Sequence, residues 1–201
     1  MIKKTFKKFF IIIFFLSQLS ISQVVKHQTP GLPESLDFKV WVNDEKVFTT
    51  KAGGDYRGSY SFANFDFNGS VKIKVQAKHA IKWLEIMPSI LNVKSKTIDD
   101  YTFEFTLNKP KKITILLNND KRNALHLLIN SIEKKTFDPE DSNVLYYKGG
   151  EIYDIGVLDL KDNQILYLES GARLKGMVRI RNAKNVKICL LYTSDAADET
   201  G

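Results

Sequence analysis

The chain has 201 residues, a formal net charge of +7 and a hydrophobic fraction of 43%. Such a length indicates one or two domains. The single cysteine excludes an intramolecular disulfide, and the three histidines show no metal-ligand spacing, so we expect no metal and no other cofactor. The lysines are scattered along the predicted strands, which argues against nucleic acid as a partner. Scattered lysines are more typical of a solvated surface than of a site for an acidic polymer such as a uronate polysaccharide.

Residues 1–22 have the three parts of a secretory signal peptide. Four lysines precede an apolar run at residues 9–16, and small residues lead to a predicted cleavage between Ser22 and Gln23. The apolar run is shorter than the ~20 residues that a membrane span needs. We therefore predict export to the periplasm or the extracellular space, without stable membrane insertion once the signal is removed.

Residues 23–34 contain two prolines and are predicted to be a linker. From Ser35 onward, apolar and polar residues alternate in about seven short segments, with turn signals roughly every 8–12 residues. This pattern predicts an antiparallel β-sandwich over residues 35–120. In one of the segments we expect Phe62, Phe65 and Phe67 to be buried together, with a bulge between the first two.

Residues 121–143 change character and end in a charged stretch that contains a proline, so we place the domain boundary there. Beyond it, residues 144–188 carry short apolar pairs with one residue between the partners, separated by Gly, Asn or Asp. Leu158 and Ile180 lie 22 positions apart, and so do Leu166 and Ile188. This period predicts coils of a parallel β-helix; a meander of β-hairpins is the alternative that the spacing permits.

Two stretches together carry a family resemblance, namely residues 60–75 with 102–105, and residues 154–188 with Gly171, Gly176 and the Asn185-Val186-Lys187-Ile188 run. They resemble the N-terminal part of exported polygalacturonase-like and dextranase-like glycoside hydrolases of the pectin-lyase-type β-helix superfamily. The resemblance implies an all-β chain in which an antiparallel β-sandwich precedes a right-handed parallel β-helix. It also implies a polysaccharide substrate, for which pectic and other acidic glycans are candidates.

The resemblance transfers no catalytic residue to this chain. In such enzymes the paired aspartates and a histidine lie on later coils, in Asn-x-Asp, Asp-Asp and His-Gly contexts. The Asp99-Asp100 pair lies in the predicted sandwich and is interpreted as a turn. We therefore expect this chain to be an inactive N-terminal fragment of a hydrolase. A polysaccharide lyase on the same scaffold and a non-catalytic carbohydrate-binding or adhesin β-helix are the alternatives.

Among the candidate site residues, Tyr146, Tyr147 and Tyr153 are the predicted substrate-binding set, because an aromatic face suits the C–H face of a sugar ring. Packing in the core is the competing interpretation. The acids near the start of the coils are interpreted as corner or solvent residues, and His126, in an apolar strand, as a buried histidine with its hydrogen bonds satisfied; the acids are Glu151, Asp154, Asp159 and Glu169.

Residues 189–201, CLLYTSDAADETG, lack the periodicity of the preceding coils. The segment is similar to a translated sequencing adapter, so we predict a non-native tail and expect the natural protein to continue beyond Ile188. The sequence leaves the oligomeric state and the identity of the glycan open.

Overall fold

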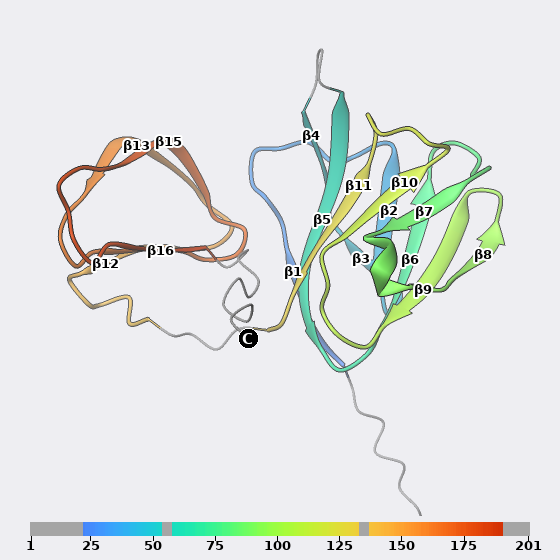
Figure 1. Ribbon diagram of the computed structural model, residues 1–201, viewed down its shortest axis with the longest axis horizontal. Coiled ribbons are helices and arrows are strands. Elements are labelled where there is room, and N and C mark those ends of the chain that lie inside the picture. Colours follow the sequence, from blue (N-terminus) through green and yellow to red (C-terminus); the bar gives the residue numbers. More distant parts are fainter. Residues whose placement is uncertain (1–21, 54–57, 133–136, 191–201) are drawn as a thin grey trace, which may run out of the picture.

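The computed structural model describes residues 22–53, 58–132 and 137–190 as an all-β chain (Figure 1). Apart from one short 3-10 turn, η2 (Ser89–Leu91), its regular elements in these ranges are strands. None of the described helical residues forms a helix long and apolar enough to cross a membrane. The predicted signal peptide, up to residue 21, lies outside the described residues.

The first sheet has six strands in the order β1-β5-β11-β10-β7, with β4 also paired to β5. Its strands are β1 (Gln23–His27), β4 (Thr49–Gly53), β5 (Ser59–Asn68), β7 (Leu84–Met87), β10 (Ile113–Leu117) and β11 (Leu125–Asn130). The β5–β11 pair is parallel and the other pairs are antiparallel.

The second sheet has five antiparallel strands in the order β3-β2-β6-β9-β8. Its strands are β2 (Phe38–Val42), β3 (Glu45–Val47), β6 (Val71–Ala77), β8 (Ser95–Asp99) and β9 (Thr102–Leu107). Alternation along β6 buries Val71, Ile73 and Val75 and turns the lysines between them outward, which is the predicted pattern.

A single apolar core draws its side chains from both sheets. Phe65 and Phe67 contribute a stacked pair from β5, with ring centroids 6.4 Å apart, and Phe103 and Phe105 contribute another from β9, at 6.2 Å. Phe65, Phe67 and Phe103 are fully shielded from solvent. These phenylalanines supply much of the buried apolar area on which the fold depends.

The predicted linker is wrong for its first residues, because Gln23–His27 forms strand β1. The reason lies in the length of β5. Strand β4 pairs only with the first half of β5, from Ser59 to Ala63, and β1 pairs with the second half, from Asn64 to Asn68. His27 Nε2 then lies 2.8 Å from Asp66 Oδ2, so β1 occupies a strand edge that would otherwise be open.

The predicted bulge in β5 is also wrong, since β5 keeps a regular register with β11 from Ser61 to Asp66, across Ala63 and Asn64. Regular alternation places Ala63, Phe65 and Phe67 on the core face, all fully buried, and places Phe62 on the opposite face, where it is partly exposed. The alanine therefore takes the core position that we assigned to a phenylalanine.

The last five strands form two parallel sets. The first set is β12 (Val144–Tyr147), β14 (Ile165–Leu168) and β16 (Lys187–Leu190), and the second is β13 (Ile152–Leu160) and β15 (Arg173–Ile180). Figure 1 shows the chain coiling between them, with β13 and β15 on one side and β12 and β16 on the other. Parallel pairing rules out the meander of hairpins.

The two predicted 22-residue spacings have different outcomes. Leu166 pairs with Ile188 as expected. Leu158 pairs with Val178 rather than Ile180, because β13 and β15 pair at a spacing of 21 positions up to Asp154 and of 20 positions from Gly156 onward, where the register shifts. Strand β16 also continues through Cys189, which pairs with Tyr167, although we predicted that the tail begins at this cysteine; residues 191–201 lie outside the described part.

Stacked asparagines turn the chain at one corner of the coils. Asn163 and Asn185 both adopt the left-handed conformation, with φ of 63° and 57°. Asn185 Nδ2 donates to Asn163 Oδ1 at 3.1 Å, and Lys184 N donates to Asp162 Oδ1 at 2.7 Å. Because each coil hydrogen-bonds the corner of the next, the corner residues fix the stacking of the coils.

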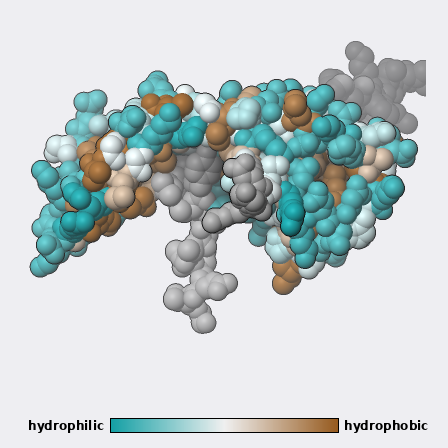
Figure 2. Space-filling view, turned by 90° about the horizontal axis from the view of Figure 1, so that it is seen from above, coloured by the Kyte–Doolittle hydropathy of each residue, from teal (hydrophilic) through white to brown (hydrophobic). Residues whose placement is uncertain are grey.

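The segment between β1 and β2 contacts the coils through Pro30 and Gly31. Arg173 Nη1 donates to the carbonyl oxygens of Pro30 and Gly31 at 3.3 and 3.2 Å. A Cβ atom added to Gly31 would come within 2.6 Å of Ile152 Cδ1, so the backbone there lies directly against the start of β13. Further along, Val157 and Met177 are exposed neighbours on β13 and β15; Figure 2 shows hydrophobic residues among hydrophilic ones on the surface of both parts.

Candidate functional site

The three predicted substrate-binding tyrosines divide between two aromatic contacts. Tyr147 meets Tyr153 edge to face, with ring centroids 4.9 Å apart, so these two side chains connect β12 with β13. Tyr146 points to the other face of its strand and stacks on Tyr167 at 5.1 Å. Phe137 covers Tyr167 in turn, at 5.2 Å. The structure thus does not bring the three tyrosines together as one platform.

The polar groups around these tyrosines hold the corner between β12 and β13. Lys148 N donates to Tyr153 Oη at 3.0 Å, and Gly149 N donates to Glu169 Oε2 at 2.8 Å. Burial raises the pKa of both Tyr146 and Tyr153, and the nearby carboxylates of Glu169 and Glu151, respectively, raise them further. Both phenols therefore stay protonated at neutral pH.

The other predicted acids lie at corners and on the surface. Asp159 forms a two-pronged ion pair with Arg179, and this hydrogen-bonded guanidinium lowers the pKa of the carboxyl. Asp99 ends β8 and its Oδ1 accepts a hydrogen bond from Tyr101 N at 2.7 Å, while Asp100 lies in the turn between β8 and β9. Within the described ranges, no group of three or more His, Cys, Asp or Glu residues is arranged to hold a metal ion.

His126 has protein partners on the outer face of the first sheet. Its Nδ1 lies 2.9 Å from Thr114 Oγ1, and the Tyr60 ring contacts it edge to face at 5.6 Å. Partial burial lowers the pKa of His126. The contact with Thr114 agrees with the predicted hydrogen bonding of His126 at Nδ1, whereas the prediction that this histidine is buried is wrong, since its side chain is half-buried on the outer face.

We expect acidification to destabilise the protein in part through His126. Its folded-state pKa is below that of the unfolded chain, so the unfolded chain binds more protons and stability falls as pH drops through the unfolded value. Melting temperatures measured at about pH 7.5 and about pH 5 should fall less for His126→Gln than for the wild type. An equal fall in both proteins would contradict this role.

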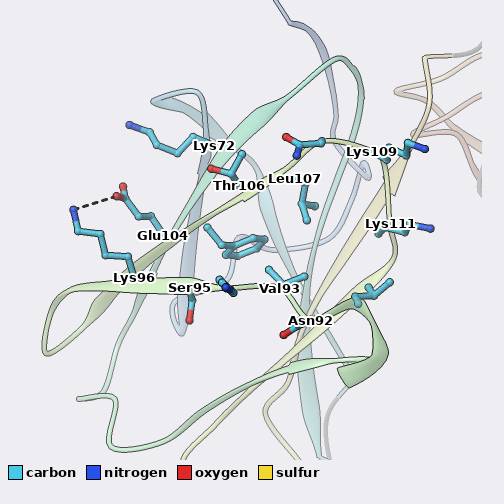
Figure 3. Close-up of a pocket in the computed structure, with 14 residues that line it drawn as sticks. Lys72, Asn92, Val93, Ser95, Lys96, Glu104, Thr106, Leu107, Lys109 and Lys111 are labelled. Atoms are coloured by element: carbon cyan, nitrogen blue, oxygen red, sulfur yellow. Dashed lines mark ion pairs between the residues drawn. The ribbon is translucent and has the colours of Figure 1, made fainter.

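A more open feature is a groove of about 670 Å³ at one end of the second sheet, which we call the lysine groove. Five lysines and one carboxylate line it, namely Lys72, Lys94, Lys96, Lys109, Lys111 and Glu104. Figure 3 shows Lys72, Lys96 and Glu104 on one side and Lys109 and Lys111 on the other. The groove exists because β8 begins opposite Phe105, so the last two residues of β9 extend beyond the end of β8.

Acids neutralise only part of this charge. Lys96 Nζ lies 3.8 Å from Glu104 Oε1, and Lys72 Nζ lies 3.5 Å from Asp44 Oδ2. In the part of the chain that the structure describes, no ion pair engages Lys94, Lys109 or Lys111. The groove therefore carries an excess of positive charge in contact with solvent.

Sequence reasoning missed the lysine groove. Its lysines come from the start of β6, from β8 and the residue before it, and from the loop after β9. They are therefore distant in sequence and close only in the fold. The nearest signal in the sequence was the lysine content of these segments, which we interpreted as ordinary solvated surface.

The fold has a counterpart among solved structures. Dex49A from Penicillium minioluteum aligns with a TM-score of 0.52 and 13% sequence identity, over 76% of this chain and 45% of that protein. The aligned part of this chain contains more residues than the sandwich sheets alone and more than the coils alone. This chain spans less than half the length of Dex49A. No protein-family model and no curated protein matches the sequence.

These observations define the class of the scaffold, an all-β fold that is similar to the fold of Dex49A. At 13% identity the similarity concerns the fold alone.

Proposed function

We propose that this chain is the N-terminal part of an exported glycoside hydrolase that acts on a polysaccharide. The predicted end of the sandwich at residue 120 is wrong, because β11 (Leu125–Asn130) lies between β5 and β10 in the first sheet. In this proposal the β-sandwich therefore extends to Asn130, the residues from there to 143 connect it to the next part, and residue 144 begins a right-handed parallel β-helix. The observation that supports it best is the structural alignment with Dex49A, which covers 76% of this chain.

The chemistry of hydrolysis explains why further coils matter. An inverting hydrolase needs an acid and a base about 6.5–9.5 Å apart, and a retaining enzyme needs two carboxyl groups about 5–5.5 Å apart. Neighbouring strands of a β-helix lie about 4.8 Å apart, so carboxylates on successive coils reach such separations. Here the acids of the first coils serve corners and ion pairs, such as Glu169 and Asp159. We propose that the catalytic carboxylates lie on coils beyond Ile188.

The test is to recover the gene with its reading frame beyond the codon for Ile188 and to express its product. We expect further coils with spacings near those of β14 and β16, and release of reducing ends from a panel of polysaccharides. The 201-residue chain, purified in parallel, should release no reducing ends. Unsaturated sugar ends would assign a lyase instead, and binding without cleavage would assign a carbohydrate-binding β-helix; either result would overturn the hydrolase proposal.

A further inference from the structure

We propose that the lysine groove binds a strand of an acidic polysaccharide whose sugar rings carry carboxylates. The inference rests on the proposed function for one premise only, that the natural ligand of the protein is a polysaccharide. The lining contains five lysines and a single carboxylate, so its net charge is positive. An anionic strand is therefore attracted along the whole groove. The groove lies at the second sheet, outside the coils.

Besides its positive charge, the lining has apolar and polar groups that suit the surface of a sugar ring. Val93 lies between the lysines of the two sides, as Figure 3 shows, and Leu91 also lines the groove; both are partly exposed, whereas Leu107 beside them packs in the core. Apolar side chains of this kind suit the C–H face of a pyranose. The side chains of Asn92, Ser95, Thr106 and Asn108 add amide and hydroxyl groups that can pair with sugar hydroxyls.

The volume suits a short stretch of glycan. About 670 Å³ is within the roughly 300–1,000 Å³ of small-molecule sites. The lysines stand on opposite sides, so successive carboxylates of one strand can each meet a different ammonium group. Lysine is a point charge on a flexible stem, and these side chains are exposed. We therefore expect moderate, salt-sensitive affinity.

Nucleic acid fits this lining less well. Single-stranded nucleic acid is held by exposed aromatic side chains on which the bases stack. The aromatic residue of the groove is Phe105, which is 3% exposed and packs in the core. Sugars with carboxylates need no stacking platform of that kind, so the lining favours the polysaccharide.

Binding of polygalacturonate to the chain at low salt tests the proposal. We expect binding, and we expect the double variant Lys109→Ala with Lys111→Ala to weaken it by on the order of tenfold. The matched control is Lys161→Ala with Lys184→Ala, which removes the same charge from exposed positions on the coils and should change affinity by less than about twofold. Far-UV circular dichroism and melting curves establish that both variants remain folded.

Fully methyl-esterified polygalacturonate, which keeps the backbone and loses the charge, should bind at least about tenfold more weakly. Equal losses in the two double variants, equal binding of the esterified polymer, or tighter binding of single-stranded DNA would each overturn the assignment. None of these measurements depends on bond cleavage, so a failure here is distinct from a failure of the proposed hydrolase activity.

Discussion

Replacing Phe65 by alanine is expected to lower the free energy of unfolding by about 3–5 kcal/mol. Phe65 lies at the centre of β5, is 0% exposed and stacks against Phe67. Truncation removes a large apolar side chain and leaves a cavity between two sheets that cannot close around it. Urea denaturation followed by tryptophan fluorescence measures the change, because both tryptophans belong to the sandwich: Trp41 lies on β2 and Trp83 directly precedes β7.

The control for this prediction is Leu36→Ala. Leu36 is 82% exposed, so its removal should change stability by no more than about 0.5 kcal/mol. A small effect at Phe65, comparable with that at Leu36, would mean that the two sheets do not share the core described above.

Replacing Gly176 by alanine is expected to disrupt the pairing of β13 with β15, at a cost of about 3 kcal/mol or more. Gly176 has a φ of 137°, and a Cβ atom there would lie 2.3 Å from the carbonyl oxygen of Gly156. The obstacle is backbone of the preceding coil, which cannot rotate away as a flexible side chain could. Loss of amide protection in β13 and β15, measured by hydrogen exchange, would show the local effect.

Gly156 provides a matched control, since it is the partner of Gly176 across the two strands. Its φ is 53°, but no atom lies within 4 Å of an added Cβ. Gly156→Ala should therefore cost only the strain of the left-handed conformation, about 1–2 kcal/mol. If the two alanine variants lost equal stability, the close approach of the coils at Gly176 would not be the cause.

Much of the fold was predictable because alternation is a local signal. Val71, Ile73 and Val75 could be assigned to a core face from their spacing alone, and Leu166 could be matched to Ile188. The errors occurred where a neighbour decides the outcome. β1 is a strand because β4 is too short to cover β5, which no property of residues 23–27 reveals.

The candidate site was less predictable than the fold. The tyrosines have the residue type that a sugar platform needs, yet alternation sends Tyr146 and Tyr147 to opposite faces of β12. The lysine groove depends on where β8 begins relative to β9, and strand register is set by the tertiary structure. Sequence patterns thus identified the strands and gave little information about the surfaces they create.

The contact between Arg173 and the carbonyls of Pro30 and Gly31 spans 143 and 142 residues of the chain. During synthesis the segment around Pro30 emerges long before the coils do, and it is already anchored by β1 on the first sheet. When the first coil forms, its residue Ile152 can pack against Gly31 of this segment, which is already in place. The coil therefore does not have to nucleate in isolation. Docking to this segment shortens the loop that must close when the first parallel strands pair, and so lowers the entropic barrier to coil formation.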